Sequence, residues 1–286
     1  MIPNLRSAVK IGWPFLTALT RKKFRSKPYV LPPTSVNIVG LRSSPSLPRR
    51  FYSTPDSSDS NTSKAKQPMI QFFGKAIDLT PGFTVRRILP NRLQRTVGSF
   101  CFLDHFGPVD LQQHSGMDVG PHPHIGLATL TYLYEGAILH RDSTGAEQII
   151  VPGAVNFMIS GKGVVHSERG RPESINGYVN ELPRASHGLQ LWMALPKDGE
   201  DVEPSFHAGQ SVVVRDDPEV QANLVVGSYM GYSVSDIPLD TQMGQVMFVD
   251  ALLRQECSTF DIAPEAGNAT DDKQVLELGI YIVCGA

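Results

Sequence analysis

The stretch 120–168 constrains the fold more than any other part of the chain, because it carries metal-competent side chains in pairs at strand spacing. His122 and His124 stand two residues apart near its start, and His166 and Glu168 stand two residues apart at its end. In a β-strand, residues i and i+2 point to the same face of the sheet. If the two strands are neighbours, three imidazoles and one carboxylate converge on one point.

The residues between the two pairs are typical of short β-strands separated by tight turns. The segment 127–134 is rich in β-branched and aromatic residues, and further strands are predicted at 137–142, 147–151 and 155–159. The pair Pro152-Gly153 is a strong turn signal between the last two. Short strands with turn signals roughly every 8–12 residues predict an all-β sandwich or barrel.

The order of these motifs resembles the pirin family, a branch of the cupin superfamily, over roughly residues 70–196. The resemblance is carried by the runs 122–136, 140–143, 152–156, 161–168 and 186–196. It implies a double-stranded β-helix (cupin) barrel with one iron held by His122, His124, His166 and Glu168. A general cupin also has a glutamate shortly after its His-x-His. Ala128 stands there in this chain, so the carboxylate has to come from Glu168.

The resemblance implies functions of two different classes. One is an iron-dependent dioxygenase that opens a flavonol-like, quercetin-type ring, a small aromatic substrate. Glu168 would then act both as ligand and as acceptor of the substrate's hydroxyl proton. The other is a non-enzymatic, iron- and redox-responsive protein that modulates a protein partner. A degenerate remnant of the family is a third reading.

Fe(II) is the expected cofactor, and other divalent metals stay open. Three imidazoles and one carboxylate also suit Mn, Co, Ni, Cu or Zn. A structural zinc site would favour closed tetrahedral coordination, often with cysteine. None of Cys101, Cys257 and Cys284 lies near the two pairs in the sequence. Three scattered cysteines also argue against a secreted disulfide scaffold.

Other polar residues fit a site less well. His105 and His114 are expected to be structural, because their spacing from the two pairs is irregular. Residues 141–143 lie at a predicted hairpin end and are also expected to be structural. Gln190 and Trp192 are expected to line the barrel mouth, and for Trp192 an inward position in the core is the alternative.

Three common kinds of active site are not supported. No Gly-x-Ser-x-Gly surrounds a nucleophile. The run 161–163 lacks the surrounding pattern of a phosphate-binding loop, and a glycine-rich dinucleotide turn is also missing. His166 and Ser167 are adjacent in a predicted strand, so they face opposite sides and cannot form a catalytic dyad.

Residues 1–52 are typical of a mitochondrial-type targeting peptide. They contain ten Lys or Arg and no Asp or Glu. The run 50–53, Arg-Phe-Tyr-Ser, resembles a presequence cleavage site. The apolar run 11–19 is too short to span a bilayer, so no transmembrane segment is expected. The matrix is the expected location, with cytoplasm or nucleus as the alternative; a chloroplast address or a disordered tail are lesser readings.

The charge of the remaining residues argues against direct nucleic-acid binding. The whole chain carries a net charge of −2, so the residues after the basic arm carry −12. A body with this excess of negative charge is a poor binder of phosphate.

The predicted domain order is a bicupin pattern with an incomplete second barrel. A flexible linker at 53–68 leads to a metal-binding cupin at 69–197, and residues 198–286 form a linker and a partial second cupin. Strands are predicted in that last part at 211–215, 224–227, 246–253 and 278–286. Open strand edges need partners. We therefore expect either a truncated product or an oligomer formed through the incomplete barrel.

Overall fold

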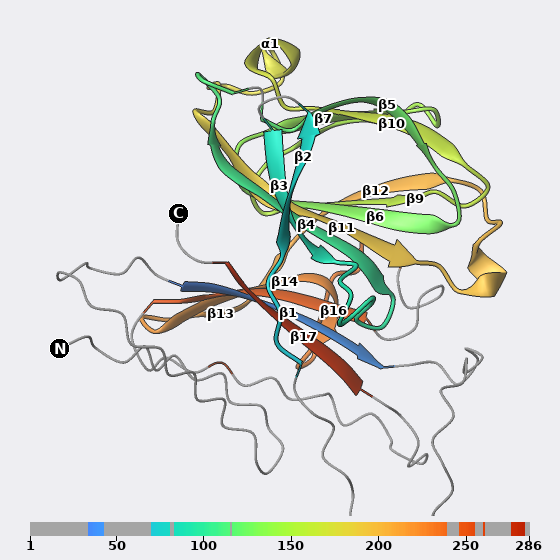
Figure 1. Cartoon of the computed structure of the whole chain (residues 1–286), viewed down its shortest axis with the longest axis vertical. Helices are drawn as coiled ribbons and strands as arrows, with labels where there is room; N and C mark the ends of the chain where they lie inside the picture. The colour runs from blue at the N-terminus through green and yellow to red at the C-terminus, as the bar shows by residue number, and fades with distance from the viewer. Residues whose placement is uncertain are drawn as a thin grey trace, which may run out of the picture.

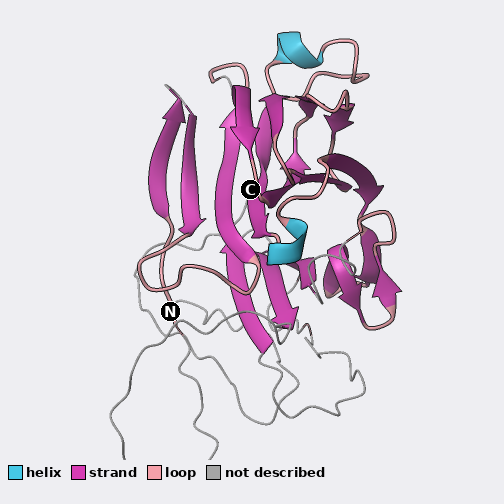
Figure 2. Ribbon diagram, turned by 90° about the vertical axis from the view of Figure 1, so that its right-hand side faces the viewer, coloured by secondary structure: helices cyan, strands magenta, loops and turns pink. Residues whose placement is uncertain are grey.

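The computed structural model describes residues 34–42, 70–80, 83–114, 116–238, 246–254, 260 and 276–283. These residues are almost entirely β-strands, with one short helix, α1 (Pro172–Ile175), and one 3-10 turn, η1 (Lys197–Gly199) (Figures 1 and 2). The all-β prediction is therefore confirmed. The predicted linker 53–68 and most of residues 1–52 lie outside the described residues.

Two sheets face each other and form the first barrel (Figure 1). The smaller sheet has the strand order β5 (Asp118–His124), β10 (Val164–Arg169), β7 (Ile138–Asp142), β8 (Glu147–Ile150). The larger sheet has the order β12 (Ser205–Gln210), β9 (Ala154–Ile159), β6 (Leu127–Glu135), β11 (Ala185–Ala194), β4 (Phe100–Asp110), β3 (Phe83–Leu89), β2 (Lys75–Thr80). This barrel contains the strands that the sequence predicts between 127 and 159, as β6, β7, β8 and β9.

The larger sheet is buried on both faces, as β6 illustrates. Its Leu133 packs with Phe83, Phe106 and Ile138 inside the barrel. Its Leu130 and Tyr132 point the other way and join a core cluster shared with the second sheet. A strand covered on both sides reads as a nearly continuous apolar run. This accounts for the composition of 127–134.

A tight glycine turn leads from β9 into β10. Gly161 has φ +45°, a conformation that favours glycine, and a Cβ there would lie 1.9 Å from the carbonyl oxygen of Val202. Ser160 and Gly163 close the turn through a backbone hydrogen bond of 2.8 Å. The turn therefore sets where β10 begins.

The second sheet packs against the outer face of the first barrel. Its order is β13 (Val212–Asp216), β14 (Val220–Tyr229), β16 (Val246–Leu253), β1 (Thr34–Arg42), β17 (Leu276–Val283), and β15 (Tyr232–Ser233) pairs with β14. The strand predicted at 246–253 has the same bounds as β16. The predicted strands at 211–215, 224–227 and 278–286 correspond to β13, β14 and β17.

The sequence did not predict β1, which lies within the segment interpreted as a targeting peptide. It pairs antiparallel with β16 on one side and with β17 on the other (Figure 1). Among the described residues, β1 is the sole strand partner of β17. The strands predicted for a partial second cupin are therefore joined here by a strand from near the start of the same chain.

Side-chain contacts also join β17 to the first barrel. Tyr281 lies 2.7 Å from Nδ1 of His105, measured at the phenol oxygen. Glu277 accepts a hydrogen bond of 2.7 Å from the backbone N–H of Gly98. The last described strand is thus tied to β4 and to the loop before it.

One buried polar contact crosses the core between the first barrel and the second sheet. The Tyr132 hydroxyl donates a hydrogen bond of 3.1 Å to Oδ2 of Asp250 on β16. Oδ1 of Asp250 has no hydrogen-bond partner among the described residues. Burial raises the pKa of Asp250 to about 6, although the hydrogen bond from Tyr132 acts in the opposite direction.

This raised pKa predicts a pH-dependent component of stability. The folded protein keeps a proton on Asp250 up to about pH 6, whereas the unfolded chain releases it near pH 4. Stability should therefore fall as the pH rises from about 4 to about 6, by on the order of 2 kcal/mol. We expect Asp250→Asn to lack this component.

Urea unfolding of the wild type and of Asp250→Asn at several pH values measures the difference. The gap between their free energies of unfolding should shift in favour of the variant between pH 4 and 6. Asp201→Asn, at an exposed position, is the matched control and should run parallel to the wild type. Parallel curves for Asp250→Asn would contradict the prediction.

Candidate metal centre

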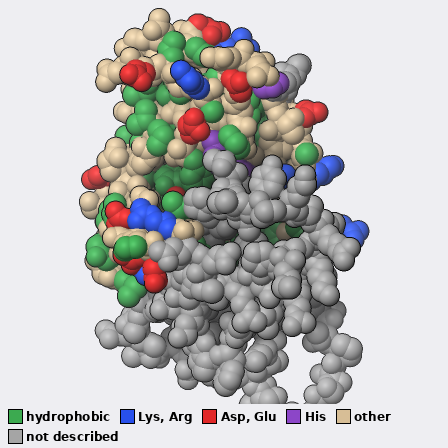
Figure 3. All heavy atoms as spheres, turned by 90° about the vertical axis from the view of Figure 1, so that its left-hand side faces the viewer, with side chains coloured by type: hydrophobic (Ala, Val, Ile, Leu, Met, Phe, Trp, Pro, Cys, Tyr) green, Lys and Arg blue, Asp and Glu red, His purple; other side chains and the backbone are tan. Residues whose placement is uncertain are grey.

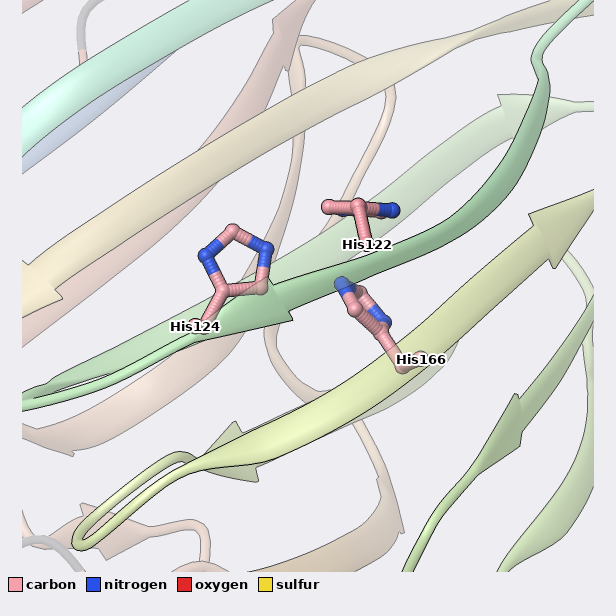
Figure 4. A group of neighbouring side chains, drawn as sticks. All are labelled: His122, His124 and His166. Atoms are coloured by element: carbon pink, nitrogen blue, oxygen red, sulfur yellow. The ribbon is translucent and has the colours of Figure 1, made fainter.

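The antiparallel pairing of β5 with β10 brings three histidines to one point. His122 lies directly opposite His166, and His124 follows two residues later on the same face of β5. One ligand atom from each of the three lies within 4.8 Å of the others. Figure 4 shows the rings from the two strands turned toward a common space. The structure thus brings together the three histidines that the sequence predicts as metal ligands.

Glu168 lies outside this group of three. The register of β10 against β5 shifts between His166 and Glu168, so that Glu168 lies opposite Val119. Its Oε1 accepts a hydrogen bond of 3.0 Å from the hydroxyl of Thr131 on the facing sheet. Burial raises the pKa of Glu168 to about 7, although the Thr131 hydrogen bond acts against it. Its role as fourth ligand stays a prediction.

His124 and His166 are in the protonation state that metal binding requires. Burial, together with the neighbouring His122, His124 and His140, lowers the pKa of His166 to about 2. Burial and then His122 lower the pKa of His124 to about 4. A neutral imidazole has a free lone pair on one nitrogen, which is the form that ligates a metal ion.

Two observations identify the nitrogens that face the centre. Nδ1 of His122 lies 2.9 Å from the carbonyl oxygen of Gly120. A carbonyl can only accept, so Nδ1 carries a hydrogen, and Nε2 is the nitrogen that can offer a lone pair to a metal ion. Nε2 of His166 is buried and has no hydrogen-bond partner among the described residues. A buried nitrogen without a partner, beside two other imidazoles, fits a metal ligand.

A cavity of about 710 Å³ adjoins the histidines. His122 and His124 line it together with the apolar side chains of Ile125, Val165 and Trp192. Ile125 is 69% exposed, so this rim of the cavity meets solvent. The cavity therefore combines a candidate metal centre with mainly apolar walls.

Trp192 is both a wall of this cavity and part of a packed ring stack. Its ring stacks on Phe102 with centroids 4.0 Å apart, and meets His124 edge to face at 5.1 Å. Gln190, two residues earlier on β11, is buried, and its Oε1 lies 2.9 Å from the hydroxyl oxygen of Thr131. Trp192 thus combines the two predicted roles, mouth and core, while Gln190 belongs to the barrel interior.

The remaining predicted residues are structural or peripheral. His105 bonds to Tyr281 and, at 2.8 Å, to His187, which confirms the prediction of a structural histidine. His114 lies exposed in the turn after β4. Arg141 donates to Glu147 at the surface of the barrel.

His140 is the residue that the sequence analysis missed. It is buried on β7, with Nε2 3.0 Å from Oδ2 of Asp142 and Nδ1 3.4 Å from Nδ1 of His166. Burial lowers its pKa, against the opposite effect of Asp142. The available signal was the spacing His140-x-Asp142, which at strand geometry puts both side chains on one face.

On the face shown in Figure 3, the positively charged side chains of the described residues are dispersed. There, Lys and Arg side chains of the described residues lie among acidic and hydrophobic ones. In the part of the chain that the structure describes, no helix is long and apolar enough to cross a membrane.

Comparisons with known proteins agree with the fold and the motif order. Residues 82–193 match the family model of pirin. A Pseudomonas aeruginosa protein, whose name assigns it provisionally as a quercetin 2,3-dioxygenase, is 40% identical over 157 residues, which are 55% of this chain and 47% of that protein. A pirin-like protein of Caulobacter vibrioides is 43% identical over 162 residues, 55% of this chain and 54% of its own length. The chain spans about half the length of these curated relatives.

A solved structure supports the same conclusion. The crystal structure of a quercetin 2,3-dioxygenase from Acinetobacter baumannii matches with a TM-score of 0.52 and 26% identity, over 65% of this chain and 75% of that one. The barrel architecture, the family model and the relatives together show that residues 82–193 form a domain of the pirin family, within the cupin superfamily.

Proposed function

We propose that this protein is an iron-dependent dioxygenase that acts on a flavonol-like, quercetin-type substrate. The observation that carries the proposal is the group of three histidines beside a cavity with apolar walls. The names of the Pseudomonas and Acinetobacter proteins support the same reaction class. Because the chain spans about half the length of its curated relatives, the activity of the whole protein is part of the proposal.

His122, His124 and His166 would hold the metal through one ring nitrogen each. When bound, Fe(II) would supply Lewis acidity toward a substrate oxygen and a one-electron redox couple. The unpartnered Nε2 of His166 fits this role, and so does the Nε2 of His122 that the Gly120 carbonyl leaves free. Imidazole ligands also suit other divalent metals, so iron itself is the part of the proposal to test.

The cavity walls suit a flat aromatic substrate. Trp192 is held in place by its stacking on Phe102, so it offers a fixed apolar surface next to His124. Ile125 and Val165 add apolar surface at the rim and would exclude water from bound rings. A substrate hydroxyl would then face the histidines.

Glu168 is the residue proposed to take the hydroxyl proton. Its carboxyl group is buried in the barrel two residues from His166, on the same strand. Thr131 holds Oε1 at 3.0 Å, which restricts how the carboxyl group can turn. The proton would move to a carboxylate oxygen of Glu168 as the hydroxyl loses it.

The metal centre can be tested by replacing its histidines one at a time in the full chain. We expect about one iron per chain after anaerobic purification. His122→Ala and His166→Ala should weaken binding on the order of 100-fold or more, because loss of outer partners alone costs roughly 10–100-fold. Elemental analysis and chelator competition measure this. His114→Ala, exposed and outside the group, is the control. Equal metal content in all variants would refute the centre.

The reaction can be tested with quercetin and the iron-loaded protein. Loss of quercetin absorbance with matching oxygen uptake is the expected result. Glu168→Gln removes the proton acceptor and should lower turnover on the order of 10²–10⁴-fold. Glu173→Gln, at a side chain that is 70% exposed, should not. An iron-loaded wild type without turnover would contradict the enzyme and favour the redox-responsive binding protein.

We infer a mitochondrial location from residues 1–52, with cleavage after Tyr52. This inference rests on the basic, acid-free composition and on the run 50–53. It has a structural consequence, because cleavage there would remove β1. β17 would then lose its strand partner among the described residues.

Import into isolated mitochondria, followed by N-terminal sequencing, tests this inference. We expect a mature chain that begins at Ser53. Hydrogen exchange at 276–283 should be faster in the mature chain than in the full chain, because β1 no longer covers that edge. Arg50→Ala should hinder the cleavage. A chain that is recovered with residues 1–52 intact, or is not imported, would overturn the inference.

A further inference from the structure

A chain of three buried side chains leads into the metal centre from the side of β7. Strands β7 and β10 are antiparallel neighbours. Nε2 of His140 lies 3.0 Å from Oδ2 of Asp142, and Nδ1 of His140 lies 3.4 Å from Nδ1 of His166. His140 and His166 are each 2% exposed, and the side chain of Asp142 is fully buried. These contacts give a partner to both ring nitrogens of His140 and to Nδ1 of His166. Nε2 of His166 is the one ring nitrogen of the two histidines without a partner among the described residues.

Asp142 is held from its other side by the turn that follows β7. Its Oδ1 accepts hydrogen bonds from the backbone N–H and the hydroxyl of Thr144, at 2.8 and 2.6 Å, and from the N–H of Ala146 at 3.2 Å. These three donors fix the orientation of the carboxylate. Oδ2 is therefore left to face His140.

The ring of His140 is held in its plane as well. It stacks on Phe206 of β12, with ring centroids 4.3 Å apart and an angle of 24° between the planes. Rotation of the imidazole would break this stacking and both nitrogen contacts together. His140 therefore links Asp142 to His166 in one fixed orientation.

The positions of the hydrogens follow from what each atom can donate or accept. An ionised carboxylate only accepts, so Nε2 of His140 carries a hydrogen. A neutral His140 then has a lone pair on Nδ1, and Nδ1 of His166 must donate to it. Nε2 of His166 is left with its lone pair, and this is the atom without a partner. A doubly protonated His140 would reverse the contact and put a hydrogen on that Nε2.

We propose that His140 and Asp142 are positioning residues that hold His166 in the tautomer able to bind a metal ion. The inference rests on the metal centre of the proposed function but not on its substrate. The backbone carbonyl of Gly120 holds the ring of His122 in the same way. For His166 the hydrogen-bond partners are side chains, so a substitution can remove them. Outer partners of this kind typically contribute about 10–100-fold to metal affinity.

Asp142→Asn is the sharpest variant, because it changes hydrogen bonding and keeps the shape. The backbone and hydroxyl donors at Oδ1 should retain the amide oxygen there, which turns the amide NH₂ toward His140. Nε2 of His140 must then accept, its hydrogen moves to Nδ1, and Nδ1 of His166 must accept in turn. The hydrogen of His166 is thereby placed on Nε2, pointing into the centre.

Nitrogen-15 NMR of the histidine rings in the metal-free full chain reads the tautomer directly. We expect the hydrogen of His166 on Nδ1 in the wild type, and on Nε2 in Asp142→Asn. Affinity for Fe(II) should fall about 10–100-fold in the variant. Asp104→Asn is the matched control, because Asp104 is also a buried carboxylate but pairs with Arg87. It should leave the His166 signals unchanged.

The outcomes separate this inference from the proposed reaction. A wild type with the hydrogen of His166 on Nε2 would overturn the inference, even if Asp142→Asn could not be folded. An unchanged His166 tautomer in folded Asp142→Asn would overturn it as well. His140→Ala supplies a second check, since His166 should then show a mixture of tautomers. The expected tautomers without quercetin turnover would support the inference and sink the dioxygenase.

Discussion

The register of β5 against β10 is the constraint on which the rest of the site depends. It sets His122 opposite His166 and places His124 two residues further along β5, on the same face. Side chains alternate across a strand, so a slip of one residue would turn the polar pair outward and bring Val165 into the barrel. The glycine turn before β10 limits such a slip, because a side chain at Gly161 would collide with the carbonyl of Val202.

A polar barrel interior is costly unless its groups pair with one another. Thr131 connects Glu168 with Gln190, and Asp142 connects with His140. Nε2 of His166 stays unpaired within this network. The unpaired atom is thus at the place where three imidazoles meet, which is the physical reason to read the group as a ligand site rather than as a polar core.

The second sheet supports this site without contributing to it. It packs on the outer face of the larger barrel sheet, and Tyr132 reaches through to Asp250. β1 lies between β16 and β17 in this sheet, so a segment far from the barrel in sequence is part of it. The larger barrel sheet therefore meets the second sheet with one face and contacts Glu168 and His124 with the other.

The sequence by itself determined the all-β class, the strands between 127 and 159, and the common face of each metal-competent pair, because these follow from local periodicity. Tertiary structure decided which strands are neighbours. It placed Glu168 opposite Val119 through a register shift, set His140 between Asp142 and His166, and inserted residues 34–42 between β16 and β17. These pairings join segments distant in the chain, and their register depends on packing across whole sheets, which a local pattern does not contain.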